Sequence, residues 1–161
     1  MSYKLPPGYQ LCIGSGRQRS TLLKFLKLSY QELFPEHNDF SHLKETISKY
    51  FSPQTPLWWV ETVGKDSASN LTEPVACLWL GNAVDQVRGD RYSHIFLLHV
   101  LPEHRRQGIG SALMRQAEDW ARERGDRQIG LQVFQGNQPA LTLYKRLGYA
   151  SQSFSMIKRL N

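Results

Sequence analysis

Apolar side chains recur along this chain at two spacings, and each spacing predicts a different kind of element. Over residues 19–33 they return every three or four positions, the period of a helix with one buried face, and Pro35 follows the last of them. Residues 57–63 alternate in the manner of a strand. The two patterns succeed one another without internal repeats, which indicates a mixed α/β (α+β) class.

The whole chain, taken in this way, predicts one domain over residues 1–161, with helices packed on a largely antiparallel sheet. We expect strands at Tyr9–Ile13, Leu57–Val63, Pro74–Leu80, 91–101, Gln128–Phe134 and Ser151–Leu160. We expect helices at Arg19–Leu33, His42–Phe51, Gly108–Arg124 and from Pro139 to Gly148. Ser41 is expected to cap the second helix and Gly125 to end the third, with a loop over 64–70.

The composition is that of an ordinary globular protein, with 40% hydrophobic and 21% charged residues in a chain of 161. No apolar run approaches the roughly 18 residues of a membrane span, and the N-terminus lacks the apolar core of a signal peptide. Cys12 and Cys77 both lie in apolar, strand-like runs, which favours buried thiols over a disulfide. We therefore expect a cytoplasmic protein with no membrane partner.

The net charge of +6 is spread along the chain. Basic and acidic residues alternate over 115–127, as on a solvated helix face, and no basic strand is interleaved with aromatic residues. This distribution disfavours a nucleic-acid partner and is equally well explained by a strongly anionic small ligand. The five histidines and two cysteines show no zinc-binding spacing, so no metal is expected.

The most informative segment is a basic, glycine-containing turn between a predicted strand and a predicted helix. Arg105-Arg106-Gln107 is followed directly by Gly108-Ile109-Gly110. Unpaired N–H groups and the helix dipole favour a phosphate at such a helix start, and arginine donors suit phosphate oxygens. The turn is not a P-loop, because the chain contains no Gly-x-x-x-x-Gly-Lys-Ser/Thr string. It is not a dinucleotide fingerprint, because Leu113 stands where a third glycine would be needed.

Two motifs give this turn a family resemblance. Arg105-x-x-Gly108-x-Gly110 resembles the phosphate-binding signature of the GCN5-related N-acetyltransferase (GNAT) family. The downstream segment from Asn137 to Tyr149 is similar to that family's Asn-x-x-Ala-x-x-Leu-Tyr-x-x-x-Gly-Phe/Tyr segment, in the same order. The resemblance implies acetyl-CoA as cofactor and a GNAT-like sheet flanked by helices.

The resemblance also implies which residues bind the cofactor. The pyrophosphate is expected to be held by Arg105, Arg106, Gln107, Gly108, Ile109, Gly110 and Ser111. The pantetheine arm is expected to run beside the preceding strand at Leu98, His99 and Val100, with a hydrogen bond from Asn137. Asn137 is equally suited to cap the helix that follows it.

Acetyl transfer to an amine requires a proton donor for the departing thiolate. The second motif makes Tyr144 the candidate for this role, because a phenol stays protonated at neutral pH. Its spacing from Ala140 and Leu147 also fits a tyrosine that merely packs in the core. Tyr144 is further expected to contact the cofactor.

The general base is where the chain departs from the family pattern. Leu97 stands where many relatives carry a glutamate. Period-two alternation places Ile95, Leu97 and His99 on one face of the strand and Phe96, Leu98 and Val100 on the other. His99, on the Leu97 face, is therefore one candidate base. Glu61 is a second, because it shares a face with Trp59 and Val63 on a strand expected closer to the acceptor. A packed histidine, a solvent-facing carboxylate or a base acting through ordered water are the alternatives.

The acceptor is the least determined part. Residues 17–53 are rich in aromatic side chains, and Glu32, Glu36, Asp39 and Glu45 could attract a cationic amine. The resulting hypothesis is an acetyl-CoA-dependent N-acetyltransferase in which a small-molecule amine, a protein N-terminus or a lysine attacks directly in a ternary complex. The alternative, motivated by Leu97, is a catalytically weak acyl-CoA-binding or regulatory module. A homodimer is compatible with either hypothesis.

Overall fold

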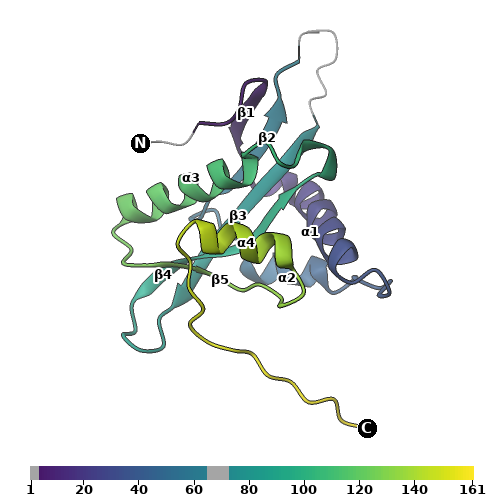
Figure 1. The fold of residues 1–161 in the computed structure, drawn as a ribbon, viewed down its shortest axis with the longest axis vertical. Helices are drawn as coiled ribbons and strands as arrows, with labels where there is room; N and C mark the ends of the chain where they lie inside the picture. Colours follow the sequence, from purple (N-terminus) through teal and green to yellow (C-terminus); the bar gives the residue numbers. More distant parts are fainter. Residues whose placement is uncertain (1–3, 65–72) are drawn as a thin grey trace.

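A five-stranded sheet in the order β1-β2-β3-β4-β5 organises the computed structural model, which describes residues 4–64 and 73–161 (Figure 1). The strands are β1 (Tyr9–Ile13), β2 (Leu57–Thr62), β3 (Pro74–Val84), β4 (Arg91–Val100) and β5 (Ile129–Leu131). The first four strands pair in antiparallel fashion, and β5 pairs with β4 in parallel. The expectation of a largely antiparallel sheet is confirmed.

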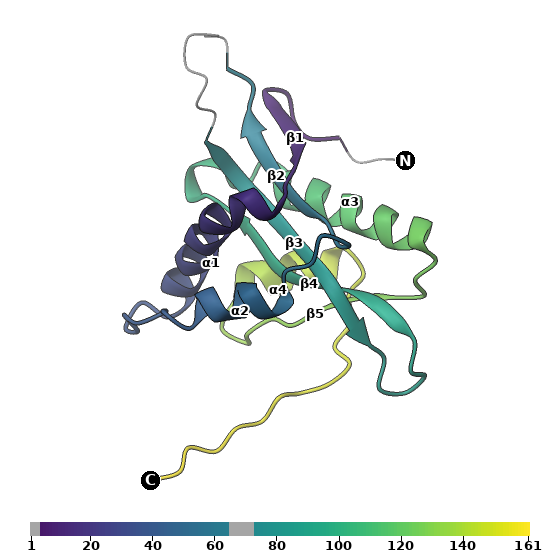
Figure 2. The ribbon, with the colours of Figure 1, turned by 180° about the vertical axis from the view of Figure 1, so that it is seen from behind.

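Two helices cover each face of this sheet. One face carries α1 (Arg19–Leu33) and α2 (Leu43–Tyr50), and the other carries α3 (Ile109–Arg124) and α4 (Gln138–Arg146), as Figures 1 and 2 show from opposite sides. Two short 3-10 turns, η1 (Gly16–Gln18) and η2 (Pro102–His104), precede α1 and α3. The described part of the chain contains no helix long and apolar enough to cross a membrane.

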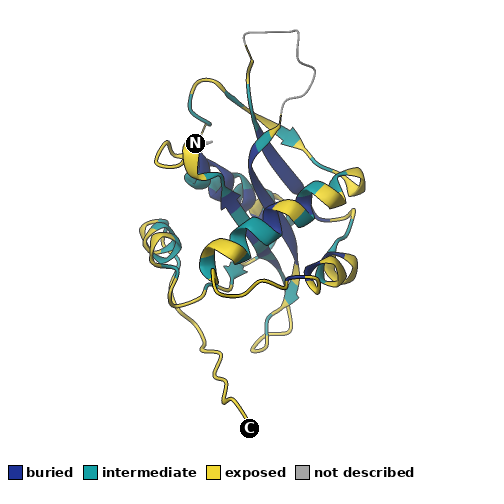
Figure 3. Ribbon diagram, turned by 90° about the vertical axis from the view of Figure 1, so that its right-hand side faces the viewer, coloured by how far each residue is buried: buried dark blue, intermediate teal, exposed yellow. Residues whose placement is uncertain are grey.

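The sheet separates two hydrophobic clusters. Leu22, Phe25 and Leu26 of α1 pack over the first cluster, and Leu113 and Ala117 of α3 pack in the second. Because both faces of β3 are covered, seven consecutive residues of this strand, 75–81, are buried, and Figure 3 shows the strand running through the interior. Cys77 lies in this run and is a buried free thiol, as expected, whereas Cys12 is a free thiol that is only half-buried.

Most helix boundaries follow the predicted pattern. α1 has the predicted bounds, and α3 ends at Gly125, whose φ of 91° allows its N–H to reach the carbonyls of Ala121 and Arg122. Ser41 is not the cap of α2: His42 occupies the cap position without a side-chain hydrogen bond, and the Ser41 N–H instead bonds to Asp39. The predicted loop over 64–70 falls almost entirely outside the described residues.

The two strands predicted near the C-terminus differ most from the structure. The strand expected over Gln128–Phe134 is reduced to the three residues of β5. The strand expected over Ser151–Leu160 is absent, and residues 151–161 run away from the sheet as an exposed, extended tail (Figures 1 and 3). Alternating apolar residues therefore did not suffice to predict pairing here, because pairing also requires an available neighbour.

A bulge in β4 changes which side chains share a face. Leu97 pairs with Trp79, but the next β3 residue, Leu80, pairs with Ile95, so Phe96 has no opposite residue. Ile95 consequently packs on the α3 face, and Phe96 joins Leu97 on the α1 face. The predicted alternation is wrong for Ile95 and Phe96, although it holds for the residues from Leu97 to Val100.

Candidate active site

The backbone after β4 has left-handed geometry at two positions. Arg106 has a φ of 63°, and Gly108, the cap residue of α3, has a φ of 87°. A β-carbon added to Gly108 would meet no atom within 4 Å. Glycine adopts this φ without strain, and the open space in front of it would let a ligand approach the backbone closely.

The start of α3 leaves backbone donors available. Its first helical hydrogen bond runs from the Ala112 N–H to the Gly108 carbonyl at 3.0 Å. The N–H groups of Ile109, Gly110 and Ser111 therefore have no partner in the part of the chain that the structure describes. Three free donors at the positive end of a 16-residue helix form the kind of site that binds a phosphate.

The two arginines of this turn differ in their partners. The Arg105 guanidinium binds both Glu32 carboxylate oxygens, at 2.6 and 2.7 Å, and its Nε donates to the Val100 carbonyl at 2.8 Å. These hydrogen bonds lower the pKa of the Glu32 carboxyl. Arg106, by contrast, has no hydrogen bond or ion pair with any described residue. The sequence did not indicate this difference, and it offered Glu32 only as one of four carboxylates that could attract a cationic amine.

The exposure of the Arg105–Glu32 ion pair limits how much it contributes to stability. The side chains of Arg105 and Glu32 are 37% and 48% exposed, and ion pairs of this exposure contribute about 1 kcal/mol or less to stability. The bidentate geometry is more informative, because it fixes the orientation of the guanidinium plane. The pair therefore contributes mainly to the position of the turn relative to α1.

A second contact fastens the same turn to β1. The Tyr9 hydroxyl lies 2.8 Å from Nδ1 of His104 and donates to the Gln107 side chain at 3.3 Å. The Tyr9 and His104 rings also meet edge to face, with centroids 5.7 Å apart. Gln107 thus lies in the turn as predicted, but its side-chain oxygen is already engaged.

The strand that leads into the turn has an open edge. β5 pairs only with Ser93, His94 and Ile95, although β4 continues to Val100. Beyond Ile95, the backbone of β4 therefore has a β-strand partner on the β3 side alone, within the described residues. Leu98 and Val100, the residues expected to line the pantetheine arm, lie in this unpaired stretch, and an extended chain could add to it as a strand would.

The structure brings the two sequence motifs together. A β-carbon on Gly110, in the first turn of α3, would lie 3.5 Å from a methyl of Leu143 in α4. Asn137 caps α4, because its side-chain oxygen accepts the Ala140 N–H at 3.4 Å. This capping role leaves the amide NH2 of Asn137 available as a donor.

Tyr144 lies in α4 and packs against the hydrophobic cluster beneath α3. Burial raises the pKa of its phenol to about 12, so the hydroxyl keeps its proton at neutral pH. The hydroxyl has no hydrogen-bond partner among the described residues. The ring lies 6.0 Å from that of Tyr149, whose own hydroxyl is engaged by Glu118 at 3.0 Å.

His99 lies on the opposite face of the sheet from Tyr144. It is only 6% exposed and meets the ring of Phe25 edge to face. Burial and the Arg105 charge lower its pKa, while Glu32 acts in the other direction. His99 is therefore neutral at neutral pH, and its backbone lies in the stretch of β4 that β5 does not pair.

Glu61, the other candidate base, lies two strands away from β4. It stands near the end of β2, opposite Pro74 of β3 and Gln10 of β1. The Cys12 thiol donates to its carboxylate at 3.3 Å, and burial together with this contact raises the pKa of Cys12. The structure thus does not bring Glu61 next to His99 or Tyr144.

The C-terminal end of α1 contacts the segments that follow both β4 and β5. Glu32 binds Arg105 after β4, and Phe34 meets Phe134 after β5, with ring centroids 4.9 Å apart and planes at 88°. Both rings remain partly exposed, at 36% and 52%. No sequence pattern signalled this contact, since its two residues lie a hundred positions apart. The contact places the C-terminal end of α1 beside the opening between β4 and β5, where the two strands are no longer paired.

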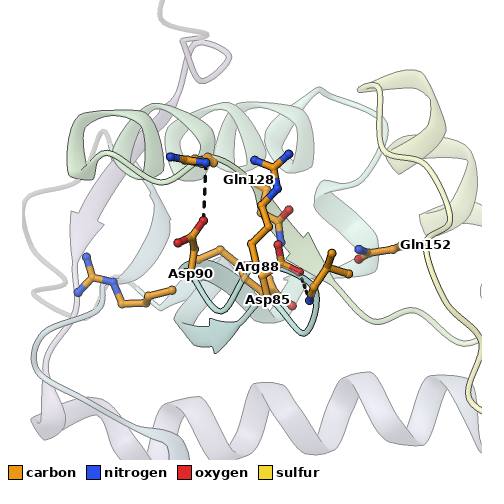
Figure 4. A pocket seen from close by; sticks show the side chains of 9 residues that line it. Asp85, Arg88, Asp90, Gln128 and Gln152 are labelled. Carbon is orange, nitrogen blue, oxygen red and sulfur yellow. Dashed lines mark hydrogen bonds and ion pairs between the residues drawn. The ribbon is translucent and has the colours of Figure 1, made fainter.

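A separate hollow of about 360 Å³ lies at the other end of β4, beside the β3–β4 hairpin (Figure 4). Asp85, Arg88, Asp90, Gln128 and Gln152 are among its lining residues, so charges of both signs meet there. It contains none of the predicted site residues. Within residues 4–64 and 73–161, no three His, Cys, Asp or Glu side chains are grouped to hold a metal ion.

Comparison with known proteins places this geometry among acetyltransferases. A 53-residue segment is 49% identical to streptothricin acetyltransferase of Streptomyces lavendulae and covers 33% of this chain and 28% of that protein. The matched segments cover less than two fifths of the length of this relative and of two others, from Methanocaldococcus jannaschii and Oryza sativa.

Solved structures share the fold over nearly the whole chain. An aminoglycoside 6'-N-acetyltransferase of Acinetobacter baumannii is 22% identical, with a TM-score of 0.65 over 96% of this chain and 99% of that chain. A ribosomal-protein-alanine N-acetyltransferase of Brucella melitensis is 18% identical, with a TM-score of 0.70 over 95% of this chain and 99% of that chain. The model of the acetyltransferase (GNAT) family matches residues 20–149. This chain belongs to the GNAT acetyltransferase family.

Proposed function

We propose that this protein is an acetyl-CoA-dependent N-acetyltransferase in which an amine attacks the acetyl group directly, within a ternary complex. The observation that carries the proposal is that the free donors at the start of α3 follow the open edge of β4, whose Leu98 and Val100 pack on the same hydrophobic cluster as Tyr144. Family membership supports the same chemistry.

The cofactor fits the residues around the turn. The N–H groups of Ile109, Gly110 and Ser111 and the unpaired Arg106 are suited to hold a pyrophosphate. Gly108 leaves room for phosphate oxygens next to the backbone. The open edge of β4 offers backbone hydrogen bonds to the pantetheine amides, and the Asn137 amide adds a donor on the α4 side.

Acetyl-CoA, when bound, supplies the acetyl group as a thioester, which a neutral amine can attack with release of the thiol. Tyr144 holds a proton on its hydroxyl at neutral pH and, in this proposal, gives it to the departing sulfur. His99 or Glu61 would take the proton of the attacking amine, His99 at the open edge of β4 and Glu61 through water.

The acceptor we propose is a small-molecule amine. The segment shared with streptothricin acetyltransferase supports this class over peptides. Glu36 and Asp39 lie exposed in the segment between α1 and α2, close in sequence to the end of α1 that crosses the opening, and they would attract a cationic amine. A protein N-terminus and a lysine are the acceptors to test beside it.

One observation favours a second function. Leu97 is 5% exposed where a carboxylate base was sought, and His99, the nearest titratable group on that face, is buried with a lowered pKa. A catalytically weak acyl-CoA-binding module would have these properties, because it needs the cofactor site without an effective base.

The deciding experiment measures thiol release from acetyl-CoA with a panel of amines, beside calorimetric binding of CoA. The panel contains streptothricin, an aminoglycoside and peptides presenting an N-terminal alanine or a lysine. Turnover with any of them supports the enzyme, whereas CoA binding without turnover supports the binding module. If neither binding nor turnover occurs, both functions are wrong. The variants His99→Gln and Glu61→Gln then show which group carries the acid limb of the pH–rate profile.

A further inference from the structure

The two arginines of the turn after β4 are inequivalent, and this asymmetry carries an inference about how the turn works. Arg105 stands first in the signature, yet all three of its nitrogens are engaged within the protein, two by Glu32 and one by the Val100 carbonyl. Arg106 has no such partners among residues 4–64 and 73–161, and its backbone lies in the left-handed region at φ 63°. Three of the five N–H donors of the Arg105 guanidinium are thereby used within the protein, which leaves fewer for a ligand at the start of α3.

We infer that Glu32 is a positioning residue, which holds Arg105 as a strut between α1 and the turn and leaves Arg106 as the phosphate-binding cation. This inference rests on the proposed function, because it concerns how the acetyl-CoA site is built.

The location of Glu32 explains why such a strut is useful. β4 and β5 diverge after Ile95, so their backbone pairing does not fix the width of the opening between them. The end of α1 reaches both sides, through Glu32 to the segment after β4 and through Phe34 to the segment after β5. Fixing Arg105 from α1 therefore fixes the turn, and with it the first N–H groups of α3, relative to this opening.

A rival explanation of the Arg105–Glu32 pair predicts the opposite effect of Glu32→Gln on CoA binding. If Arg105 bound the phosphates and Glu32 merely competed for it in the free protein, removing the Glu32 charge would release Arg105 and tighten CoA binding. If Arg105 is a strut, the same change loosens the turn and weakens CoA binding by about fivefold, the equivalent of an ion pair of this exposure. Arg106→Gln would weaken CoA binding by about tenfold or more in the strut case only, by loss of a charged hydrogen bond.

The test uses the full chain and CoA as the probe, with dissociation constants measured by calorimetry. Glu32→Gln is compared with Glu123→Gln, which makes the same charge change at an exposed site in the last turn of α3 that has no ion pair with any described residue. The charge swap Glu32→Arg with Arg105→Glu is the rescue variant. We expect the swap to restore binding to nearly the wild-type level, whereas a phosphate-binding Arg105 predicts that a glutamate at 105 abolishes it.

A second measurement needs neither cofactor nor turnover. Hydrogen exchange over 101–108 in the free protein should rise in Glu32→Gln, stay unchanged in Glu123→Gln and fall again in the swap. Tighter or unchanged CoA binding in Glu32→Gln, or failure of the swap with intact thermal stability, would overturn the positioning role. Failure of the proposed function is read separately, from the wild-type protein alone, as absence of CoA binding or of thiol release.

Discussion

The ring of Phe96 occupies the space where a β-carbon on Gly81 would lie. These residues belong to neighbouring strands, and Phe96 is the bulged residue of β4. The absence of a side chain on Gly81 is therefore what lets the bulge turn its aromatic ring onto the sheet, between Trp79 and Tyr50.

Gly81→Ala should destabilise the protein by about 1–3 kcal/mol, because the ring of Phe96 has to leave a packed position. For a chain of this size that corresponds to a fall of roughly 2–4 °C in the melting temperature per kcal/mol. Gly136→Ala is the control, since a β-carbon there meets nothing within 4 Å. Equal melting temperatures for both variants would contradict the view that Gly81 makes room for the Phe96 ring.

Gly108→Asp should abolish CoA binding while the protein stays folded. The added carboxylate would stand in the open space before the α3 donors and repel the phosphates. The left-handed φ adds a backbone strain of about 1–2 kcal/mol. Gly125→Asp is a matched control, because it has a similar φ of 91° and open surroundings at the far end of the same helix. Calorimetry should show unchanged CoA binding for the control.

Tyr144→Phe should lower the rate of the chemical step by about a hundredfold or more, the usual contribution of a proton donor. CoA affinity should hardly change, because only the hydroxyl is removed. Rapid-quench measurement of one turnover separates the chemical step from product release. Tyr149→Phe is the comparison, since its hydroxyl serves Glu118 and its loss should cost stability without slowing the reaction. A normal rate in Tyr144→Phe would rule out the acid role.

The protein should lose stability as the pH falls from about 7 to 5. Burial lowers the pKa of both His94 and His99 below the ordinary value of 6.5. The unfolded chain then takes up protons before the folded one, so the free energy of unfolding declines below pH 6.5 until the folded-state histidines titrate. The pKa of Glu32 is lowered by Arg105, so protonation of Glu32 reduces the free energy of unfolding only near and below about pH 4.

Thermal melts across this pH range test the histidine contribution. In His94→Leu, which removes a buried ring nitrogen that has no partner among the described residues, the decline between pH 7 and 5 should become shallower. A wild-type melting temperature that is constant over the same range would show that neither histidine is buried in its neutral form.

The C-terminal tail should mediate self-association. Its four large apolar side chains, at 154, 156, 157 and 160, are each at least 78% exposed, and such a group of apolar side chains is normally covered. We expect the full chain to form a homodimer, and a chain ending at Ala150 to be a stable monomer. Sedimentation velocity compares the two, with a Met156→Ser, Ile157→Ser variant as the control of full length. A monomeric full-length chain would contradict this expectation.

Local signals in the sequence were sufficient for much of the fold. α1 has its predicted bounds because its apolar spacing and the Pro35 that follows it are signals local to this one segment. The bulge at Phe96 was not predictable in this way, since it depends on Gly81 in another strand. The turn was located by its glycines, but the partner of Arg105 lies 73 residues away, on α1. Contacts between distant segments thus account for what the pattern missed at the site.

The shortness of β5 raises the question of what stops β5 from pairing with the rest of β4. Val133 and Phe134, just beyond β5, are strand-forming residue types, and their side chains would be compatible with continued pairing of β5 with β4. The Phe134 ring is instead held by Phe34 of α1. This aromatic contact competes with extension of β5, so a helix on one face of the sheet helps to keep the edge of β4 beyond Ile95 without a strand partner on that side, within the described residues.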